Sequence, residues 1–203
     1  HTIKYGPKIL TALWMFLFLP SADLKGQSFE LEPHQQLARD ILQEIIEINT
    51  VDSAGTTKAA KALERRLLEA GFSDEDVRVV GPTQKKMNLV ARLRGRDTGR
   101  PAILLLAHLD VVEALRSDWN MDPWKMIEQD GHFYGRGVID DKDEAAIYTA
   151  NLIRYKQEGF VPDRDIIIAL TADEEGGEHN GVQWLLENHR ELIDAEYALN
   201  EGG

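Results

Sequence analysis

His108 and Asp110 are the first residues whose types and spacing could do chemistry. They follow an apolar run over residues 103–107. On an extended segment, residues two positions apart share a face, so Asp110 can reach one nitrogen of His108 and hold the ring while the other nitrogen binds a metal ion. A single His-x-Asp pair is more often an ordinary hydrogen-bonded pair, so a metal role depends on further ligands nearby.

Two adjacent carboxylates, Asp140 and Asp141, form a second group just before a segment that reads as a helix. Because a helix dipole stabilises negative charge at its start, capping of that helix is the alternative to metal binding. The Gly-x-Gly of residues 135–137 lacks the third glycine of a dinucleotide-binding fingerprint and the strand that should precede it. A dinucleotide site is therefore excluded.

Three successive acids, Asp173, Glu174 and Glu175, form a third group after the apolar run of residues 166–170. A run of charges usually marks a solvated turn. Here it follows residues that point into a core, so at least one acid should face the edge of the sheet and need a partner, which a divalent cation would supply. All three groups fall at or beside the ends of predicted strands, where open α/β sheets bind ligands.

The residue types of these groups narrow the choice of metal ion. One histidine, several carboxylates and no cysteine match zinc, cobalt or manganese. The absence of cysteine also excludes disulfides and cysteine nucleophiles. The set is short by one or two ligands, and Glu201, after another predicted strand, could supply one of them.

Alternating helices and strands must position these groups. Leu37, Ile41, Ile45 and Ile48 recur with the spacing of one face of an amphipathic helix. Residues 103–106 are apolar at every position, which indicates a strand buried on both faces. Further helices are predicted over 56–70, 143–158 and 182–189, strands over 77–80, 88–93, 102–107, 165–170 and 196–199, and a long loop over 111–137. We therefore predict a single α/β domain, a three-layer sandwich around a mixed, mainly parallel sheet.

Composition and charge limit the function classes. The chain has 203 residues, of which 43% are hydrophobic, and this suits one globular domain. Its net charge of -12 would repel a polyanion over most of the surface. Nucleic-acid binding is therefore excluded.

The first residues read as a signal peptide over 1–26, followed by the domain over 27–203. Lys4 and Lys8 precede an apolar run over residues 9–19, and small residues follow it. A run of this length, at about 1.5 Å per residue, covers only about half of a ~30 Å hydrocarbon core. We expect a secreted or periplasmic protein, with an uncleaved signal anchor as the alternative.

Taken in order, the groups resemble the M20 metallopeptidase and deacylase family over about residues 32–203. The motifs that carry the resemblance are His108-x-Asp110, Gly135-Arg136-Gly137-x-x-Asp140-x-Lys142, Asp173-Glu174-Glu175-Gly176 and Asn200-Glu201-Gly202. The resemblance implies a zinc-exopeptidase-like catalytic domain that cleaves an amide bond with two divalent metal ions. Zinc is the first choice, and cobalt and manganese are the alternatives.

The resemblance implies a ligand set for these two ions. His108 would bind the first ion and Glu201 would complete its shell, while Glu175 would bind the second ion. Asp140 would bridge both ions with one oxygen to each. Asp141 would be a neighbour of the site and not a ligand.

Glu174 and Asp110 would be the catalytic residues that are not ligands. Two cations about 3.5 to 4 Å apart can share a hydroxide, lower its pKa and polarise the scissile carbonyl. Glu174, as the general base, would take the proton of the attacking water and pass it to the leaving amine. Asp110 would orient His108.

The sequence departs from the family pattern in one respect. Family members have a further histidine ligand near the carboxyl end and an inserted lid domain that helps to bind substrate and to dimerise. Neither is present here, and His179, four residues after Glu175, is expected to be a surface loop residue. We expect an incomplete catalytic domain that is inactive or nearly so by itself, with any homodimer formed by the full-length protein through the lid.

Three functions remain open at this point. The leading hypothesis is a hydrolase of the carboxypeptidase or dipeptidase type that acts on a peptide or an N-acyl amino acid. An N-acyl-amino-acid deacylase of the same family is the first alternative. A non-catalytic relative is the second, and it would be favoured if Asp140, Glu174 or Glu175 were replaced, but all three are present.

Overall fold

The computed structural model describes residues 30–97 and 99–201, and the predicted signal peptide lies outside these ranges. The helices are α1 (Pro33–Ile46), α2 (Thr57–Glu69), α3 (Lys142–Gln157), α4 (Gly181–Asn188), α5 (Arg190–Ile193) and the 3₁₀ helix η1 (Arg116–Asp118). The strands are β1 (Val77–Val80), β2 (Asn88–Leu93), β3 (Ala102–His108), β4 (Ile127–Gln129), β5 (His132–Tyr134), β6 (Ile166–Thr171) and β7 (Ala195–Leu199).

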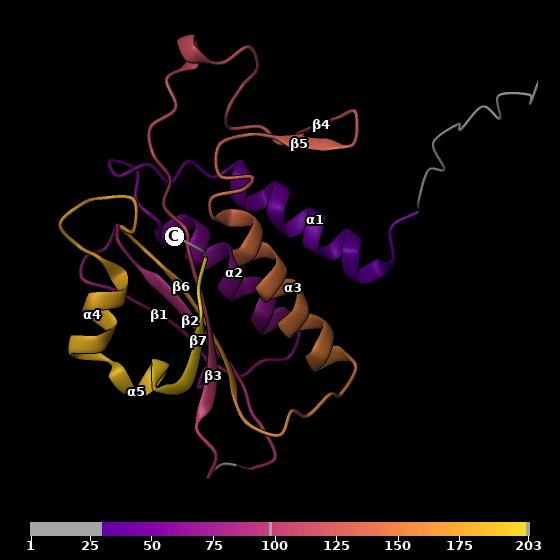
Figure 1. The fold of residues 1–203 in the computed structure, drawn as a ribbon, viewed down its shortest axis with the longest axis vertical. Helices are drawn as coiled ribbons and strands as arrows, with labels where there is room; N and C mark the ends of the chain where they lie inside the picture. The colour runs from indigo at the N-terminus through magenta and orange to yellow at the C-terminus, as the bar shows by residue number, and fades with distance from the viewer. Residues whose placement is uncertain (1–29, 98, 202–203) are drawn as a thin grey trace, which may run out of the picture. The chain divides into compact units, whose positions relative to one another are not determined.

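The main sheet has five strands in the order β1-β2-β6-β3-β7. β3 pairs in parallel with both β6 and β7, while β2 runs antiparallel to its neighbours β1 and β6. All strands of the main sheet except β2 therefore run in the same direction. Figure 1 shows helices on both faces of this sheet. The predicted α/β sandwich with a mixed, mainly parallel sheet is confirmed.

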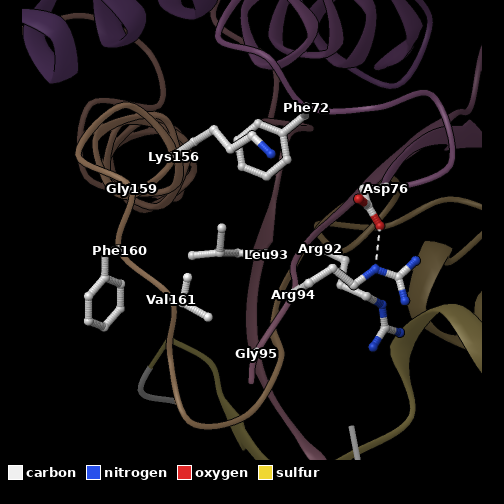
Figure 2. Close-up of a pocket in the computed structure, with 10 residues that line it drawn as sticks. All are labelled: Phe72, Asp76, Arg92, Leu93, Arg94, Gly95, Lys156, Gly159, Phe160 and Val161. Atoms are coloured by element: carbon white, nitrogen blue, oxygen red, sulfur yellow. Dashed lines mark hydrogen bonds and ion pairs between the residues drawn. The ribbon is translucent and has the colours of Figure 1, made fainter. Parts of the chain in front are cut away.

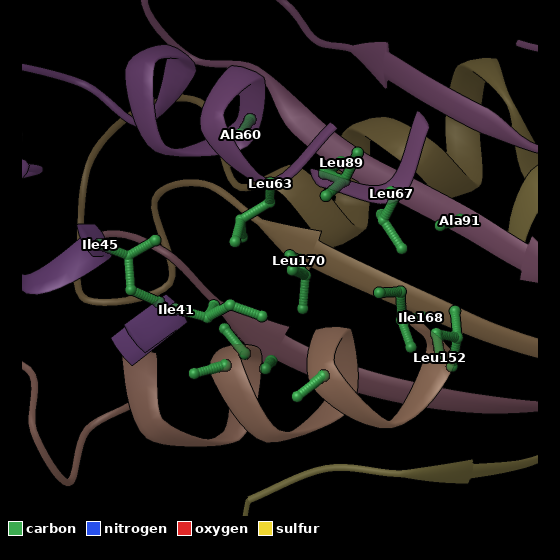
Figure 3. Packing of buried hydrophobic residues seen from close by; sticks show 14 of the residues in the cluster. Ile41, Ile45, Ala60, Leu63, Leu67, Leu89, Ala91, Leu152, Ile168 and Leu170 are labelled. Atoms are coloured by element: carbon green, nitrogen blue, oxygen red, sulfur yellow. The ribbon is translucent and has the colours of Figure 1, made fainter. Parts of the chain in front are cut away.

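Helices α1, α2 and α3 cover one face of the sheet and enclose the larger core, which Figure 3 shows in part. Ile41, Leu63 and Leu152, one from each helix, are fully buried against Ile168 and Leu170 of β6. Burying one such side chain contributes about 1.5 to 3 kcal/mol relative to leaving it in water. This core packs the helices against the strands that carry the candidate site.

Helices α4 and α5 cover the other face with a smaller cluster. Leu185 of α4 and Ile193 of α5 pack against Ile167 and Ala169 of β6. Because successive side chains of a strand point to opposite faces, a strand between two cores must be apolar at every position. The unbroken apolar run of β6 has this cause.

The ends of α1 and α2 follow from local sequence. Pro33 opens α1, and the side chain of Gln35 accepts a hydrogen bond from the backbone N–H of Glu32 at 2.9 Å. Gly71 follows α2 with a φ of 93°, a conformation that glycine adopts without steric cost. The helix predicted over 56–70 is confirmed to within one residue at each end, and the amphipathic helix predicted around residues 37–48 is confirmed as α1.

Two features of the fold differ from the sequence prediction. The predicted loop over 111–137 contains the two-stranded hairpin β4-β5, which turns at Asp130 and Gly131 with φ values of 53° and 76°. An Asp-Gly turn is a recognised hairpin signal, but strands of three residues are too short to show an alternating pattern. The short helix α5 was also missed. Among the described residues, none of the helices is both long enough and apolar enough to cross a bilayer.

Candidate metal centre

The carboxyl ends of parallel strands bring the predicted ligands together. His108 ends β3 and pairs with Thr171, which ends β6, while Glu201 follows the neighbouring strand β7. Asp140 reaches the same place from the loop before α3. His108, Asp140 and Glu201 each offer one ligand atom, and these atoms all lie within 4.8 Å of one another.

Three carboxylates converge on a single nitrogen, Nε2 of His108. Oδ1 of Asp140 lies 2.9 Å from it, and an oxygen of Glu174 and an oxygen of Glu201 each lie 3.7 Å away. The His108 side chain is 2% exposed, while that of Asp140 is 57% exposed. The cluster is therefore buried on the side of His108 and open to solvent on the side of Asp140.

The other nitrogen of His108, Nδ1, is held by Asp110, but not in the predicted way. It lies 3.0 Å from the main-chain oxygen of Asp110 and 3.6 Å from the nearer carboxylate oxygen. A carbonyl oxygen can only accept, so Nδ1 donates its proton there, and Nε2 is the nitrogen that would bind a metal ion once it has lost its own proton. Asp110 thus orients the ring through its backbone.

The carboxylate of Asp110 has a different task. Its two oxygens accept hydrogen bonds from the backbone N–H groups of Glu174 and Glu175, at 3.2 and 3.0 Å. Asp110 therefore links the His108 ring to the turn that carries the two glutamates. The sequence did not indicate this second contact, because it depends on how β3 and β6 pair.

The charges around His108 fit a cation. Burial alone would lower the pKa of its ring, but Asp110 and Asp141 outweigh this and raise it from 6.5 to about 10. Burial and the neighbouring Asp140 raise the pKa of Glu175, and burial likewise raises that of Glu201. Crowded carboxylates around an imidazole form the donor set that divalent zinc, cobalt or manganese ions prefer, so these residues fit such an ion.

Asp141 and Lys142 fix the loop that presents Asp140. Asp141 is 1% exposed, and its carboxylate accepts a hydrogen bond from the backbone N–H of His108 at 3.0 Å, while burial raises its pKa to about 7. It makes no capping bond to α3, so helix capping does not explain this side chain. Lys142 is fully buried and donates from Nζ to the carbonyl oxygens of Ile45 and Ile48, both at 2.8 Å.

Glu175 lies outside this cluster. Among residues 30–97 and 99–201 it joins no group of three potential ligands whose donor atoms lie within 4.8 Å of one another. Its side chain instead borders a hollow of about 310 Å³, which Asp110 and Val112 also line. The structure thus brings together His108, Asp140, Glu174 and Glu201, and leaves Glu175 beside them.

The buried acid of the third group is Asp173, and its partner is a lysine. Asp173 is 2% exposed and forms an ion pair with Lys86, which is itself 7% exposed. The sequence left open which of the three acids needs a partner, and for Asp173 that partner is Lys86 and not a divalent cation. Lys86 was missed because it follows Lys85 in a polar loop and reads as a solvated charge.

A second hollow lies at the other end of the sheet (Figure 2). It has a volume of about 380 Å³ and is lined in part by Phe72, Leu93, Arg94 and Lys156. Leu93 pairs with Ile166 at the start of β6, whereas the candidate centre is at the end of that strand. This hollow therefore takes no part in the candidate centre.

Comparisons with known proteins agree with this picture. The chain is 36% identical to succinyl-diaminopimelate desuccinylase of Parvibaculum lavamentivorans over 76% of this chain, and 31% identical to mouse (Mus musculus) aminoacylase-1 over 69%. It spans only 39% and 34% of the length of these two relatives. The crystal structure of human carnosine dipeptidase 1 has the same fold, with a TM-score of 0.64 and 21% identity over 84% of this chain and 39% of that one.

The family comparison covers the strands and loops that build the candidate centre. Residues 104–203 match the family described as Peptidase family M20/M25/M40. That range contains His108, Asp140 and Glu201, and it starts within β3, the central strand of the site. Together with the fold and the two relatives, this match shows that the chain belongs to the M20/M25/M40 peptidase family.

Proposed function

We propose that the protein hydrolyses an amide bond in an N-acyl amino acid or a peptide, with two divalent metal ions bound at the candidate centre. The observation that carries this proposal is the convergence of His108, Asp140 and Glu201 within 4.8 Å. Membership of a metal-dependent hydrolase family supports the reaction class. Zinc is the proposed metal, and cobalt and manganese fit the same ligands.

His108, Asp140 and Glu201 would hold the first ion, and Asp140 and Glu175 would hold the second. Such ions lower the pKa of water and polarise the scissile carbonyl group. The position of Glu175 just outside the cluster is consistent with a second ion beside the first. The open side of the cluster, where Asp140 is exposed, leaves room for substrate.

Glu174 is the proposed general base. Its carboxylate is 47% exposed and lies 3.7 Å from Nε2 of His108, so it borders the ligand cluster and also reaches solvent. A carboxylate in that place can take a proton from the attacking water and deliver it to the leaving amine. Asp110 fixes the backbone of Glu174 and so sets where that carboxylate points.

The relatives favour N-acyl amino acids as substrates. The two sequence relatives are by name a desuccinylase and an aminoacylase, while the dipeptidase is similar at the level of fold. We therefore propose a deacylase as the first candidate and a dipeptidase or carboxypeptidase as the second. Secretion, through the predicted signal peptide over residues 1–26, and dimerisation of the whole protein through a lid domain also remain proposals.

A paired substrate assay of the full-length protein tests this function. The N-acetyl derivative of one amino acid and a dipeptide that ends in the same amino acid are compared, each with zinc and after chelation. A deacylase cleaves the first substrate faster, a dipeptidase cleaves the second, and chelation abolishes either activity. Hydrolysis that survives complete removal of metal would contradict the proposal.

A further inference from the structure

Lys86 is a buried cation outside the candidate ligand set. It lies in the segment between β1 and β2, and its backbone N–H donates to Oγ1 of Thr83 at 3.1 Å. Its Nζ contacts the carboxylate of Asp52 at 2.6 Å and that of Asp173. Lysine is almost never fully buried unless it is paired, so both contacts point to a specific task.

The two partners of Lys86 differ in their surroundings. The side chain of Asp52 is 72% exposed, whereas that of Asp173 is 1% exposed. The pair with Asp173 is therefore the inner one and is screened least by water. Since Lys86 points inward between two acids, it is not placed to bind the carboxylate of a substrate.

Asp173 organises the turn that carries the two glutamates. Its φ of 56° lies in the left-handed region, which aspartate tolerates better than most residues. Its second carboxylate oxygen accepts from the backbone N–H of His179 at 3.3 Å. A Cβ at Gly177 would come within 2.6 Å of that oxygen, so the turn closes tightly around the Asp173 side chain.

The turn is therefore anchored from two sides. Asp110 binds the backbone N–H groups of Glu174 and Glu175, and Lys86 binds the preceding residue, Asp173. Both anchors act on consecutive residues, so loss of either one would let the Glu174 carboxylate move relative to His108. Asp110 belongs to the candidate centre, whereas the Nζ of Lys86 pairs with Asp52 and Asp173, neither of which is a candidate ligand.

We propose that Lys86 is a positioning residue, which through Asp173 fixes the turn that places Glu174 at the candidate metal centre and Glu175 beside it. This inference rests on the proposed function for its kinetic consequences, but the fixing of the turn is a property of the chain itself. Two measurements therefore test the fixing of the turn and its kinetic consequences separately.

The first measurement is amide hydrogen exchange in the full-length protein. Lys86→Gln removes the charge, Lys86→Arg keeps it with a different shape, and Lys85→Gln is the matched control because Lys85 is exposed. Exchange at the amides of Glu174 and Glu175 should be at least about tenfold faster in Lys86→Gln than in the wild type or the control. Unchanged protection of these amides in Lys86→Gln would overturn the proposal, whether or not the protein is an amide hydrolase.

The second measurement is steady-state kinetics at saturating zinc, with thermal unfolding of each variant. We expect a roughly tenfold to hundredfold lower kcat in Lys86→Gln, a smaller loss in Lys86→Arg, and little change in KM or in the Lys85→Gln control. A variant that unfolds at a lower temperature but keeps the wild-type kcat would show a merely structural role and contradict the proposal.

If Lys86→Gln does not fold, the comparison of Lys86→Arg with Lys85→Arg decides, and equal kcat values for these two variants would contradict the proposal. A wild type without activity on either substrate refutes the proposed function instead, and hydrogen exchange then decides the role of Lys86.

Discussion

The two sides of the candidate metal centre are built in different ways. On one side, His108 ends β3, Glu201 follows the adjacent parallel strand β7, and Asp140 is fixed by the buried Asp141 and Lys142 behind it. On the other side, Glu175 lies in a loop next to Gly176 and Gly177 and is held by its backbone. Candidate ligand atoms on or beside paired strands already lie close together, whereas Glu175, the proposed ligand in the loop, lies apart from them. We infer that the proposed first metal position is more strongly preorganised than the proposed second one.

The largest expected effect is a loss of turnover without a loss of bound metal, caused by a substitution at Glu174. Glu174→Ala in the full-length protein should lower kcat by about 10² to 10⁴, because it removes a general base. Metal content, measured by elemental analysis after dialysis, should stay at the wild-type value, because Glu174 is not a proposed ligand. Retained turnover would sink the assignment of the base.

A comparison of two ligand variants tests the difference between the two sides directly. His108→Ala should weaken the tightest zinc site by more than about 100-fold, since loss of even an outer partner of a ligand costs about 10-fold to 100-fold. Glu175→Ala should leave that site nearly unchanged and weaken only a second one. Zinc titration by calorimetry measures both, with Glu178→Ala as a control on the same loop. Equal losses from both variants would show that the two sides are not built differently.

The support behind Asp140 can be broken without touching a ligand. Lys142→Met removes the donor to two carbonyl groups, the buried one of Ile45 and the partly buried one of Ile48, and should lower the free energy of unfolding by about 2 to 4 kcal/mol. Lys156→Met, an exposed lysine of the same helix that lies over the ring of Phe72, should change it by less than about 1 kcal/mol. Urea unfolding measures both, and similar values for the two variants would exclude a structural role for Lys142.

The smallest expected effect concerns Asp165, a carboxylate at the opposite end of the sheet that forms an ion pair with Arg92. Burial raises the pKa of Asp165, but hydrogen bonds from Gly95 and Arg92 outweigh it and hold the pKa below 3.8. The stability that Asp165 contributes is therefore present above about pH 4 and is lost as the pH falls through the lower, folded pKa. Asp165→Asn should cost about 1 to 2 kcal/mol at pH 7 and progressively less in acid. Urea unfolding at several pH values measures this cost, and a cost that changes on addition of zinc would show that this end of the sheet is coupled to the metal centre.

The fold was largely predictable because its elements have regular patterns. The four-residue spacing of α1 and the unbroken apolar runs of β3 and β6 follow from which faces are buried, and burial on both faces of the sheet requires such runs. The hairpin β4-β5 was not predictable in this way because three residues do not define a period. Helices and strands that are long enough to repeat their hydrophobic pattern several times can be predicted from sequence.

The candidate site was predictable only in part. Residues at the ends of strands, such as His108 and Glu201, could be expected to meet because parallel strands end at one edge. The pairing of Lys86 with Asp173 could not be expected, because Lys85 and Lys86 look alike until the tertiary structure buries one of them. For the same reason, the sequence did not reveal that Asp110 holds His108 by its carbonyl group and the glutamate turn by its carboxylate.

The most direct test of this account is an anomalous difference map at the zinc absorption edge, from crystals of the full-length protein grown with zinc. The account predicts a peak about 2.0 to 2.2 Å from Nε2 of His108 and from a carboxylate oxygen of both Asp140 and Glu201. A bound zinc ion that none of these three residues contacts would contradict it.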